Sequence, residues 1–189
     1  AFGLASKGQL LTRSGAKSGD VIAVTGQLGA ASAGLKILLE RLQPKGYEKL
    51  IKAQLEPIAR VREGMLLAKN GARAAIDITD GLAANLWQMS RMSKAKLIID
   101  HEKVPIHPLV QKFAERHGFD VEDFAFFRGE DFELLFTVRR GRWKRVQLAL
   151  KRIGTAATAI GHVRSGRGVY IRKHGILEKL PDRGYEHFR

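Results

Sequence analysis

The fold is decided by the stretch Ala74-Ala75-Ile76-Asp77-Ile78-Thr79-Asp80-Gly81-Leu82, in which an apolar run meets two carboxylates, a hydroxyl and a glycine. Its apolar first half predicts a buried strand that ends at Asp77. Thr79 and Asp80 are therefore expected at the N-terminus of the helix that follows. Apolar residues recur at helical spacing along that helix, at Leu82, Leu86, Met89 and Met92.

Two interpretations of this junction are open. Unpaired backbone N–H groups and the helix dipole favour anions at a helix N-terminus, and a carboxylate on each side of the turn can hold Mg²⁺ that bridges to nucleotide phosphates. In that case Asp77 and Asp80 are metal ligands. Alternatively, Thr79 or Asp80 only caps the helix, and Asp77 is the solvated end of a strand.

The composition limits the classes of protein to which the chain can belong. Its 189 residues suffice for one well-cored domain, and no run approaches the roughly 18 apolar residues that a membrane span needs. The absence of cysteine from the sequence excludes disulfides, thiolate metal sites and a cysteine nucleophile. We therefore expect a soluble, cytoplasmic protein that does not bind a membrane.

The charge of the chain points to an anionic partner. There are 33 basic and 19 acidic residues, which give a net charge of +14. Such a field attracts nucleotides, phosphorylated metabolites or nucleic acid. The densest basic run, 139–145, is compatible with nucleic-acid binding. Trp143, however, falls on the apolar stripe of the helix that this run opens, which favours a solvated helix face.

Strand and helix patterns alternate along the chain. Helices alternate with strands early and the later strands follow one another closely, which predicts an α+β fold with a mixed β-sheet flanked by helices. In the helix expected over 31–43, Leu35, Leu38, Leu39 and Leu42 form the predicted apolar face. The other expected strands cover 21–25, 95–100, 134–138, 159–163 and 169–172, and the other expected helices cover 47–55, 60–68, 82–93 and 109–117.

Two further segments carry charged groups that suit a ligand. Arg13 lies in a glycine-punctuated loop before the first strand, where its guanidinium can bind a phosphate or remain solvated. Glu130, Asp131 and Glu133 follow a glycine and precede a buried strand. These carboxylates can bind a cationic ring or a metal, or they form a solvated rim.

Taken together, six segments resemble the C-terminal domain of the thiamine-monophosphate kinases, a family of the aminoimidazole-ribonucleotide synthetase-like superfamily. The similarity runs over essentially the whole chain. The segments, in order, are Arg13-Ser14-Gly15-Ala16-Lys17, Val24-Thr25-Gly26, Arg60-Val61 with Gly64, Ile76-Asp77-Ile78-Thr79-Asp80-Gly81-Leu82, Gly129-Glu130-Asp131-Phe132-Glu133-Leu134-Leu135-Phe136 and Gly184-Tyr185-Glu186-His187-Phe188.

The resemblance implies an ATP-dependent phosphotransferase that converts thiamine monophosphate to thiamine diphosphate. It implies that residues 1–20 are a connecting arm from an N-terminal ATP-binding domain outside this sequence, and that residues 21–189 are the C-terminal domain. The full-length protein is then expected to be a homodimer, and this chain alone an incomplete catalyst. The alternatives are another ATP-using member of the superfamily, of selenophosphate synthetase or hydrogenase-maturation type, or a basic nucleic-acid-binding module.

The resemblance also implies roles for individual residues. Phosphoryl transfer to a phosphate brings several negative charges together, which metal ions and an arginine neutralise. The chain departs from the family pattern at Thr79 in place of serine, Phe132 in place of tyrosine, Gly29-Ala30 in place of Gly-Asp, and Arg128 in place of a second glycine. The implied roles are Mg²⁺ ligation by Asp77 and Asp80, ATP contacts from Arg13 and Thr79, and thiamine phosphate contacts from Glu130 and Tyr185.

Overall fold

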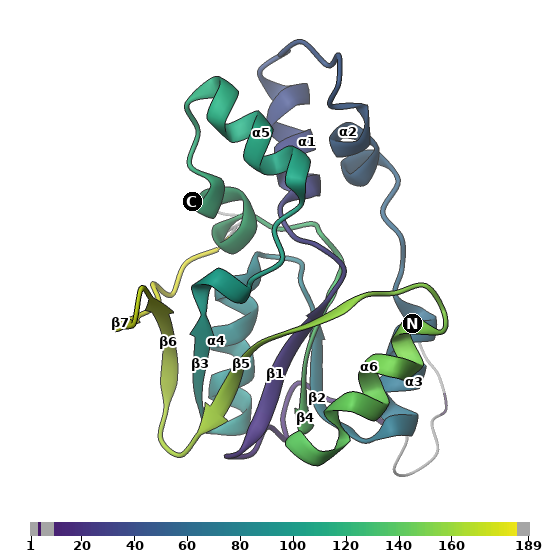
Figure 1. The fold of residues 1–189 in the computed structure, drawn as a ribbon, viewed down its shortest axis with the longest axis vertical. Coiled ribbons are helices and arrows are strands. Elements are labelled where there is room, and N and C mark those ends of the chain that lie inside the picture. The colour runs from purple at the N-terminus through teal and green to yellow at the C-terminus, as the bar shows by residue number, and fades with distance from the viewer. Residues whose placement is uncertain (1–3, 5–9, 185–189) are drawn as a thin grey trace.

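Seven strands form one sheet in the computed structural model, which describes residue 4 and residues 10–184 (Figure 1). The strand order is β2–β4–β1–β5–β3–β6–β7. Neighbouring strands are antiparallel except β3 and β6, which are parallel. The strands are β1 (Asp20–Thr25), β2 (Ala72–Asp77), β3 (Lys96–Asp100), β4 (Leu134–Arg139), β5 (Ala157–Arg164), β6 (Gly168–Lys173) and β7 (Ile176–Lys179).

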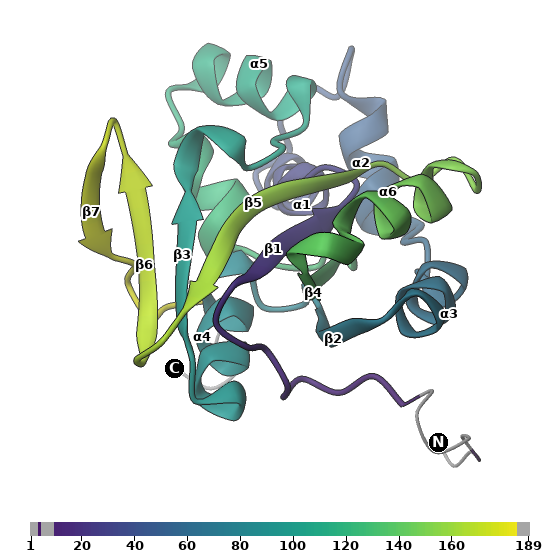
Figure 2. The ribbon, with the colours of Figure 1, turned by 60° about the horizontal axis from the view of Figure 1, so that its bottom comes forward.

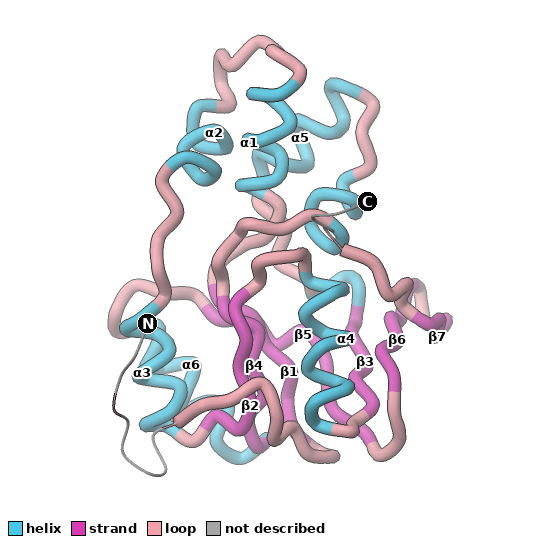
Figure 3. Tube along the Cα trace, turned by 180° about the vertical axis from the view of Figure 1, so that it is seen from behind, coloured by secondary structure: helices cyan, strands magenta, loops and turns pink. Residues whose placement is uncertain are grey.

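Helices cover both faces of the sheet. Figure 3 shows α4 on one face, and Figure 2 shows α3 and α6 on the other. Among the described helices, none combines the length and the apolar character that a membrane span requires. The helices are α1 (Ala30–Leu39), α2 (Glu48–Leu55), α3 (Val61–Asn70), α4 (Leu82–Ser93), α5 (Pro108–His117) and α6 (Trp143–Lys151), with short turns at η1 (His101–Lys103), η2 (Asp123–Phe127) and η3 (Arg140–Arg142).

The interior strand β1 is apolar between Asp20 and Thr25, and both of its faces are covered. Ile22 and Val24 pack in the core that β1 shares with α4, and Ala23 packs in the core that it shares with α3 and α6. The near-continuous apolar run therefore predicts this strand correctly. The predicted mixed sheet flanked by helices is confirmed.

A separate helical lobe lies beyond one end of the sheet. It contains α1, α2, α5 and η2, as Figure 1 shows. These elements share their own buried cluster, which includes Ile37, Leu50, Phe113 and Phe124. The sheet and this lobe meet along the loops that carry most of the candidate site residues.

The predicted apolar face of the first helix is wrong. The helix ends at Leu39 instead of Gln43, and its leucines do not form its buried side. The buried face is made by small residues and Ile37, because α2 packs very closely: a Cβ placed on Gly34 would lie 2.1 Å from the carbonyl oxygen of Leu50. Leu39 is 73% exposed.

The β2–α4 turn (residues 78–81) confirms the predicted end of β2 but excludes the predicted side-chain cap of the helix. Strand β2 ends at Asp77, as predicted. The N-cap of α4 is Gly81, with φ 102°, and no side chain caps this helix end. Neither Thr79 nor Asp80 is therefore a helix cap. A Cβ on Gly81 would lie 2.9 Å from the carbonyl oxygen of Phe126, so the close approach also requires glycine.

A buried ion pair holds the β4 loop (residues 128–133) to the sheet. The guanidinium of Arg60 donates from Nε to Oε2 of Glu133 over 2.9 Å and from Nη2 to Oε1 over 2.5 Å. The hydroxyl of Thr25 donates to Oε2 of the same carboxylate over 2.5 Å and accepts from the backbone N–H of Leu134. Glu133 thus joins the end of β1, the start of α3 and the start of β4.

The carboxylate of Asp131 occupies the N-terminus of α1. It accepts from the backbone N–H of Gly29 over 2.8 Å and from that of Ala31 over 3.4 Å. Burial raises the pKa of Asp131 to about 7, against the opposing effect of these backbone donors and with a further upward contribution from Glu133. This helix N-terminus is therefore occupied by a side chain of the chain itself.

Replacing Arg60 by methionine leaves the buried carboxylate of Glu133 without its cation. We expect Arg60→Met to lower the free energy of unfolding by about 3 kcal/mol. This value lies at the lower end of the usual cost of breaking a buried ion pair, because the arginine is partly exposed. Arg62→Met, which removes an exposed arginine two positions along, should change it by less than about 0.5 kcal/mol. Urea unfolding measures both, and equal midpoints for the two variants would refute the structural role of the pair.

Asp131 gives the stability of the chain a defined pH dependence. The pKa of Asp131 is higher in the folded chain than in the unfolded chain. The contribution of Asp131 to the free energy of unfolding therefore falls as the pH rises from about 4 to about 7, by at most about 1.4 kcal/mol per pH unit. Asp131→Asn removes this titration. The unfolding free energy of the parent chain relative to the variant should therefore be lower at about pH 7 than at about pH 5. A difference between the two proteins that stays constant with pH would contradict the assignment.

Candidate functional site

The site is built where two chain segments lie side by side through backbone hydrogen bonds. The N–H of Ile78 donates to the carbonyl of Glu133 over 2.8 Å, and the N–H of Phe132 donates to the carbonyl of Ile78 over 3.0 Å. The N–H of Glu130 donates to the carbonyl of Thr79 over 2.9 Å. The pairing of β2 with β4 thus continues beyond the strands and brings the β2–α4 turn against the β4 loop.

The backbone of the β4 loop is shaped for this contact. A Cβ on Gly129 would lie 1.7 Å from the carbonyl oxygen of Thr79, so only glycine fits there. Glu130 and Phe132 have φ values of 69° and 50°, in the left-handed region that side chains other than glycine rarely adopt. The loop therefore holds a strained conformation, which is typical of ligand-binding segments.

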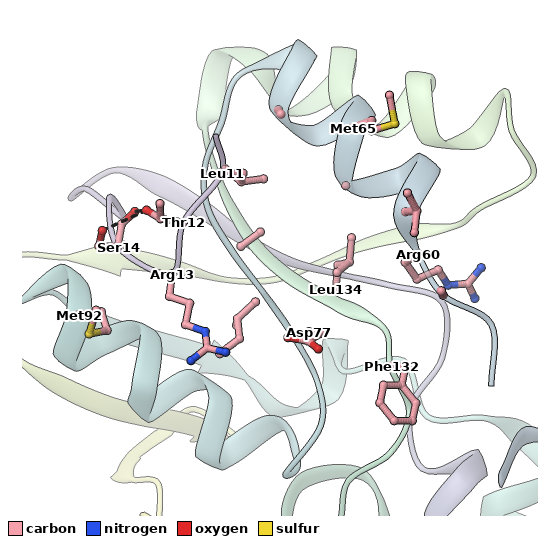
Figure 4. Close-up of a pocket in the computed structure, with 16 residues that line it drawn as sticks. Leu11, Thr12, Arg13, Ser14, Arg60, Met65, Asp77, Met92, Phe132 and Leu134 are labelled. Atoms are coloured by element: carbon pink, nitrogen blue, oxygen red, sulfur yellow. Dashed lines mark hydrogen bonds between the residues drawn. The ribbon is translucent and has the colours of Figure 1, made fainter. Parts of the chain in front are cut away.

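One cavity of about 860 Å³ contains Arg13 and Asp77. Figure 4 shows the guanidinium of Arg13 extending into this cavity on the same side as Asp77. The segment of Arg13 is fixed to the edge of the sheet, because the N–H of Ala75 donates to the carbonyl of Thr12 over 2.9 Å. Within the described residues, neither Arg13 nor Asp77 forms an ion pair.

A second cavity of about 650 Å³ contains Thr79, Asp80 and Glu130. Phe132 lines both cavities, so the two lie next to each other. Of the sequence-predicted site residues, the structure thus places Arg13 and Asp77 in one cavity and the other three in its neighbour. Tyr185 lies outside the described residues.

The carboxylates of Asp77 and Asp80 suit a metal that retains water and phosphate ligands. Asp77 is exposed and Asp80 is half-buried, and neither carboxylate has a hydrogen bond or an ion pair within the part of the chain that the structure describes. That part contains no cluster of three or more metal-binding side chains. Mg²⁺ is commonly bound through one or two carboxylates together with substrate phosphates and water, so the residue type and the unpartnered state of each carboxylate are compatible with it.

The sequence alone did not show that the three carboxylates of the β4 loop have different partners and different exposure. Glu133 pairs with Arg60, Asp131 binds the N-terminus of α1, and Glu130 is the one of the three whose side chain is exposed. The Arg60–Glu133 contact raises the pKa of Arg60, with its hydrogen bond to Glu133 as the largest cause. The position of Glu133 directly before an apolar strand was the available signal that it is buried.

Gln54 is a site residue that sequence reasoning missed. It comes from the last turn of α2, in the helical lobe, and its Nε2 donates to Oε2 of Glu130. It lines the second cavity together with Leu35 and Leu39 of α1. No motif in the sequence pointed to this glutamine, because its place in the site depends on how α2 packs against α1.

Comparisons with known proteins agree with this architecture. The model of the family described as AIR synthase related protein, C-terminal domain, matches residues 17–174. Thiamine-monophosphate kinase from Pyrococcus horikoshii is 39% identical over 183 residues, which are 96% of this chain and 54% of that relative. The chain therefore spans about half the length of the curated relatives that it matches.

Solved structures share the fold. The structure of AaThiL complexed with AMPPCP and TMP matches with a TM-score of 0.80 and 34% identity, over 94% of this chain and 54% of that chain. The hydrogenase maturation protein HypE of E. coli matches with a TM-score of 0.73 and 22% identity, over 94% and 54% of the two chains, which shows the fold alone. Because the family model covers most of the sequence, this chain belongs to the AIR synthase related proteins and contains their C-terminal domain.

Proposed function

We propose that this chain supplies about half of an ATP-dependent kinase that converts thiamine monophosphate to thiamine diphosphate. The observation that carries the proposal is the match, at 34% identity over 94% of this chain, to a structure that contains both AMPPCP, an ATP analogue, and TMP. The 39% identical relative from Pyrococcus horikoshii is named for the same activity. The two adjacent cavities offer room for a nucleotide phosphate chain and a second substrate.

On the nucleotide side, the groups of the chain bind and orient phosphates. Arg13 lies in the first cavity, and its permanently charged guanidinium can donate two hydrogen bonds to a phosphate. Thr79, whose hydroxyl is the second proposed ATP contact, lies in the turn before α4. Asp77 and Asp80 are the proposed ligands of Mg²⁺. When bound, this metal neutralises the charge that accumulates as the γ-phosphoryl group moves between two anionic oxygens.

On the acceptor side, the second cavity combines one exposed carboxylate with apolar walls. Glu130 can offset the positive charge of a thiazolium, while Leu35, Leu39 and Phe132 provide surface for its rings. Tyr185, which lies outside the described residues, remains predicted to stack on a ring of the acceptor. Since Asp80 and Glu130 line the same cavity, the phosphate of an acceptor held by Glu130 can lie near the proposed metal ligands.

The rest of the proposed enzyme lies outside these residues. A whole protein of the relatives' length has a further domain, and we propose that this domain completes the ATP site and forms a homodimer in the cytoplasm. Residues 1–20 then act as the arm between the two domains, and residues 21–189 as the C-terminal domain. The isolated chain is accordingly proposed to be an incomplete catalyst.

The alternative functions have weaker support. The 22% identity to HypE supports a common fold and not a common substrate. The basic run 139–145 covers the last residue of β4, η3 and the start of α6, and none of its residues lines either cavity of the proposed site. We therefore do not favour a nucleic-acid-binding module.

The proposal is tested with the full-length protein that contains this chain. Asp77→Asn combined with Asp80→Asn should lower the rate of ATP-dependent formation of thiamine diphosphate by more than about a hundredfold, since a bound metal contributes several kcal/mol of transition-state stabilisation. The variant should also need much more Mg²⁺ for half-maximal rate. Product formation measured over a Mg²⁺ titration gives both values.

Asp182→Asn is the matched control. Asp182 is an exposed aspartate that pairs with Arg91 on the surface, so its replacement should leave the rate and the Mg²⁺ requirement unchanged. If the double variant kept the parent rate and the parent Mg²⁺ requirement, the assignment of Asp77 and Asp80 would be wrong. Absence of thiamine monophosphate phosphorylation by the parent protein would overturn the proposed function itself.

A further inference from the structure

Gln54 brings the helical lobe into contact with the β4 loop at the second cavity. Its carboxamide donates to the carboxylate of Glu130, a residue 76 positions away in the sequence. Glu130 is exposed, and among the described residues its carboxylate has no other hydrogen bond and no ion pair. The position of the Glu130 carboxylate therefore depends on Gln54.

The same carboxamide has an unused acceptor. Its oxygen, Oε1, is buried and accepts no hydrogen bond within the described residues. A buried acceptor without a donor is unfavourable, and a ligand that supplies an N–H group removes that penalty. Because the amide nitrogen is committed to the Glu130 carboxylate, the oxygen is the atom left to recognise a donor.

The walls around this carboxamide suit a flat heterocycle. Leu35 and Leu39 of α1 line the cavity on the side of the helical lobe, and Phe132 lines it on the side of the sheet. Leu39, the last residue of α1, is 73% exposed, so its side chain is accessible to a ligand in this cavity. The cavity thus combines apolar walls and an amide acceptor with two carboxylates, of Asp80 and Glu130, and the guanidinium of Arg128.

We propose that Gln54 is a specificity-determining residue for the acceptor substrate. Its Oε1 accepts a hydrogen bond from the exocyclic amino group of an aminopyrimidine ring, and its Nε2 positions Glu130 for the cationic part of the same molecule. This inference rests on the proposed function, since it assigns the second cavity to thiamine monophosphate. It adds a recognition residue in α2 that none of the sequence motifs contains.

The test compares two acceptors in the full-length protein. One is thiamine monophosphate, and the other is its analogue with an oxo group in place of the amino group. An amide oxygen attracts the amino group and repels the oxo group, so the parent protein should prefer thiamine monophosphate in kcat/KM. Gln54→Met, which keeps the length of the side chain, should lower kcat/KM for thiamine monophosphate about tenfold, mainly through KM, and remove most of this preference.

Two further variants make the outcome specific. Gln54→Glu keeps an acceptor oxygen but introduces a charge that repels Glu130. It should therefore raise KM while retaining the preference for thiamine monophosphate over the oxo analogue. This variant provides the test if Gln54→Met does not fold. Gln43→Met replaces an exposed glutamine outside both cavities and should behave as the parent protein.

The outcomes separate the two proposals. If the parent protein phosphorylates thiamine monophosphate but Gln54→Met retains both kcat/KM and the preference for the amino group, the role of Gln54 is refuted and the proposed function stands. If the parent protein does not phosphorylate thiamine monophosphate, the proposed function and this inference both fall.

Discussion

The buried ion pair between Arg60 and Glu133 is the contact on which the geometry of the site depends. A carboxylate in this position must be paired, and it is paired by a guanidinium from the start of α3 and a hydroxyl from the end of β1. These contacts fix the residue that precedes β4. The strained backbone of Glu130 and Phe132 is held between this anchor and the β2–α4 turn.

The location of the two cavities follows from this arrangement. The backbone pairing continues beyond β2 and β4, while the carboxylates of Asp77 at the end of β2 and Asp80 in the turn have no partners among the described residues. The helical lobe then closes over the β4 loop through Asp131 at the N-terminus of α1 and through Gln54 at the end of α2. A site between a rigid sheet and a second packed unit is a common place for ligands.

Much of the fold was predictable because local patterns agree with tertiary packing. The apolar run of β1, the end of β2 at Asp77 and the helix over 82–93 all lie where the sequence places them. The apolar face predicted for the first helix is wrong, because Leu35 and Leu39 line a cavity while small residues admit the close approach of α2. The different environments of Glu130 and Asp131 depend on partners distant in sequence, in α2 and at the N-terminus of α1, so no local pattern could distinguish these two carboxylates.

Amide hydrogen exchange in the Glu133→Gln variant tests most directly whether this ion pair fixes the site. Exchange at the N–H groups of Glu130 and Phe132 should accelerate by at least about tenfold relative to the parent chain, because their bonds to the β2–α4 turn would open more often. Exchange in the central strand β1 should be much less affected. Unchanged protection of both amides would show that the loop keeps its shape without the ion pair, and would contradict this account.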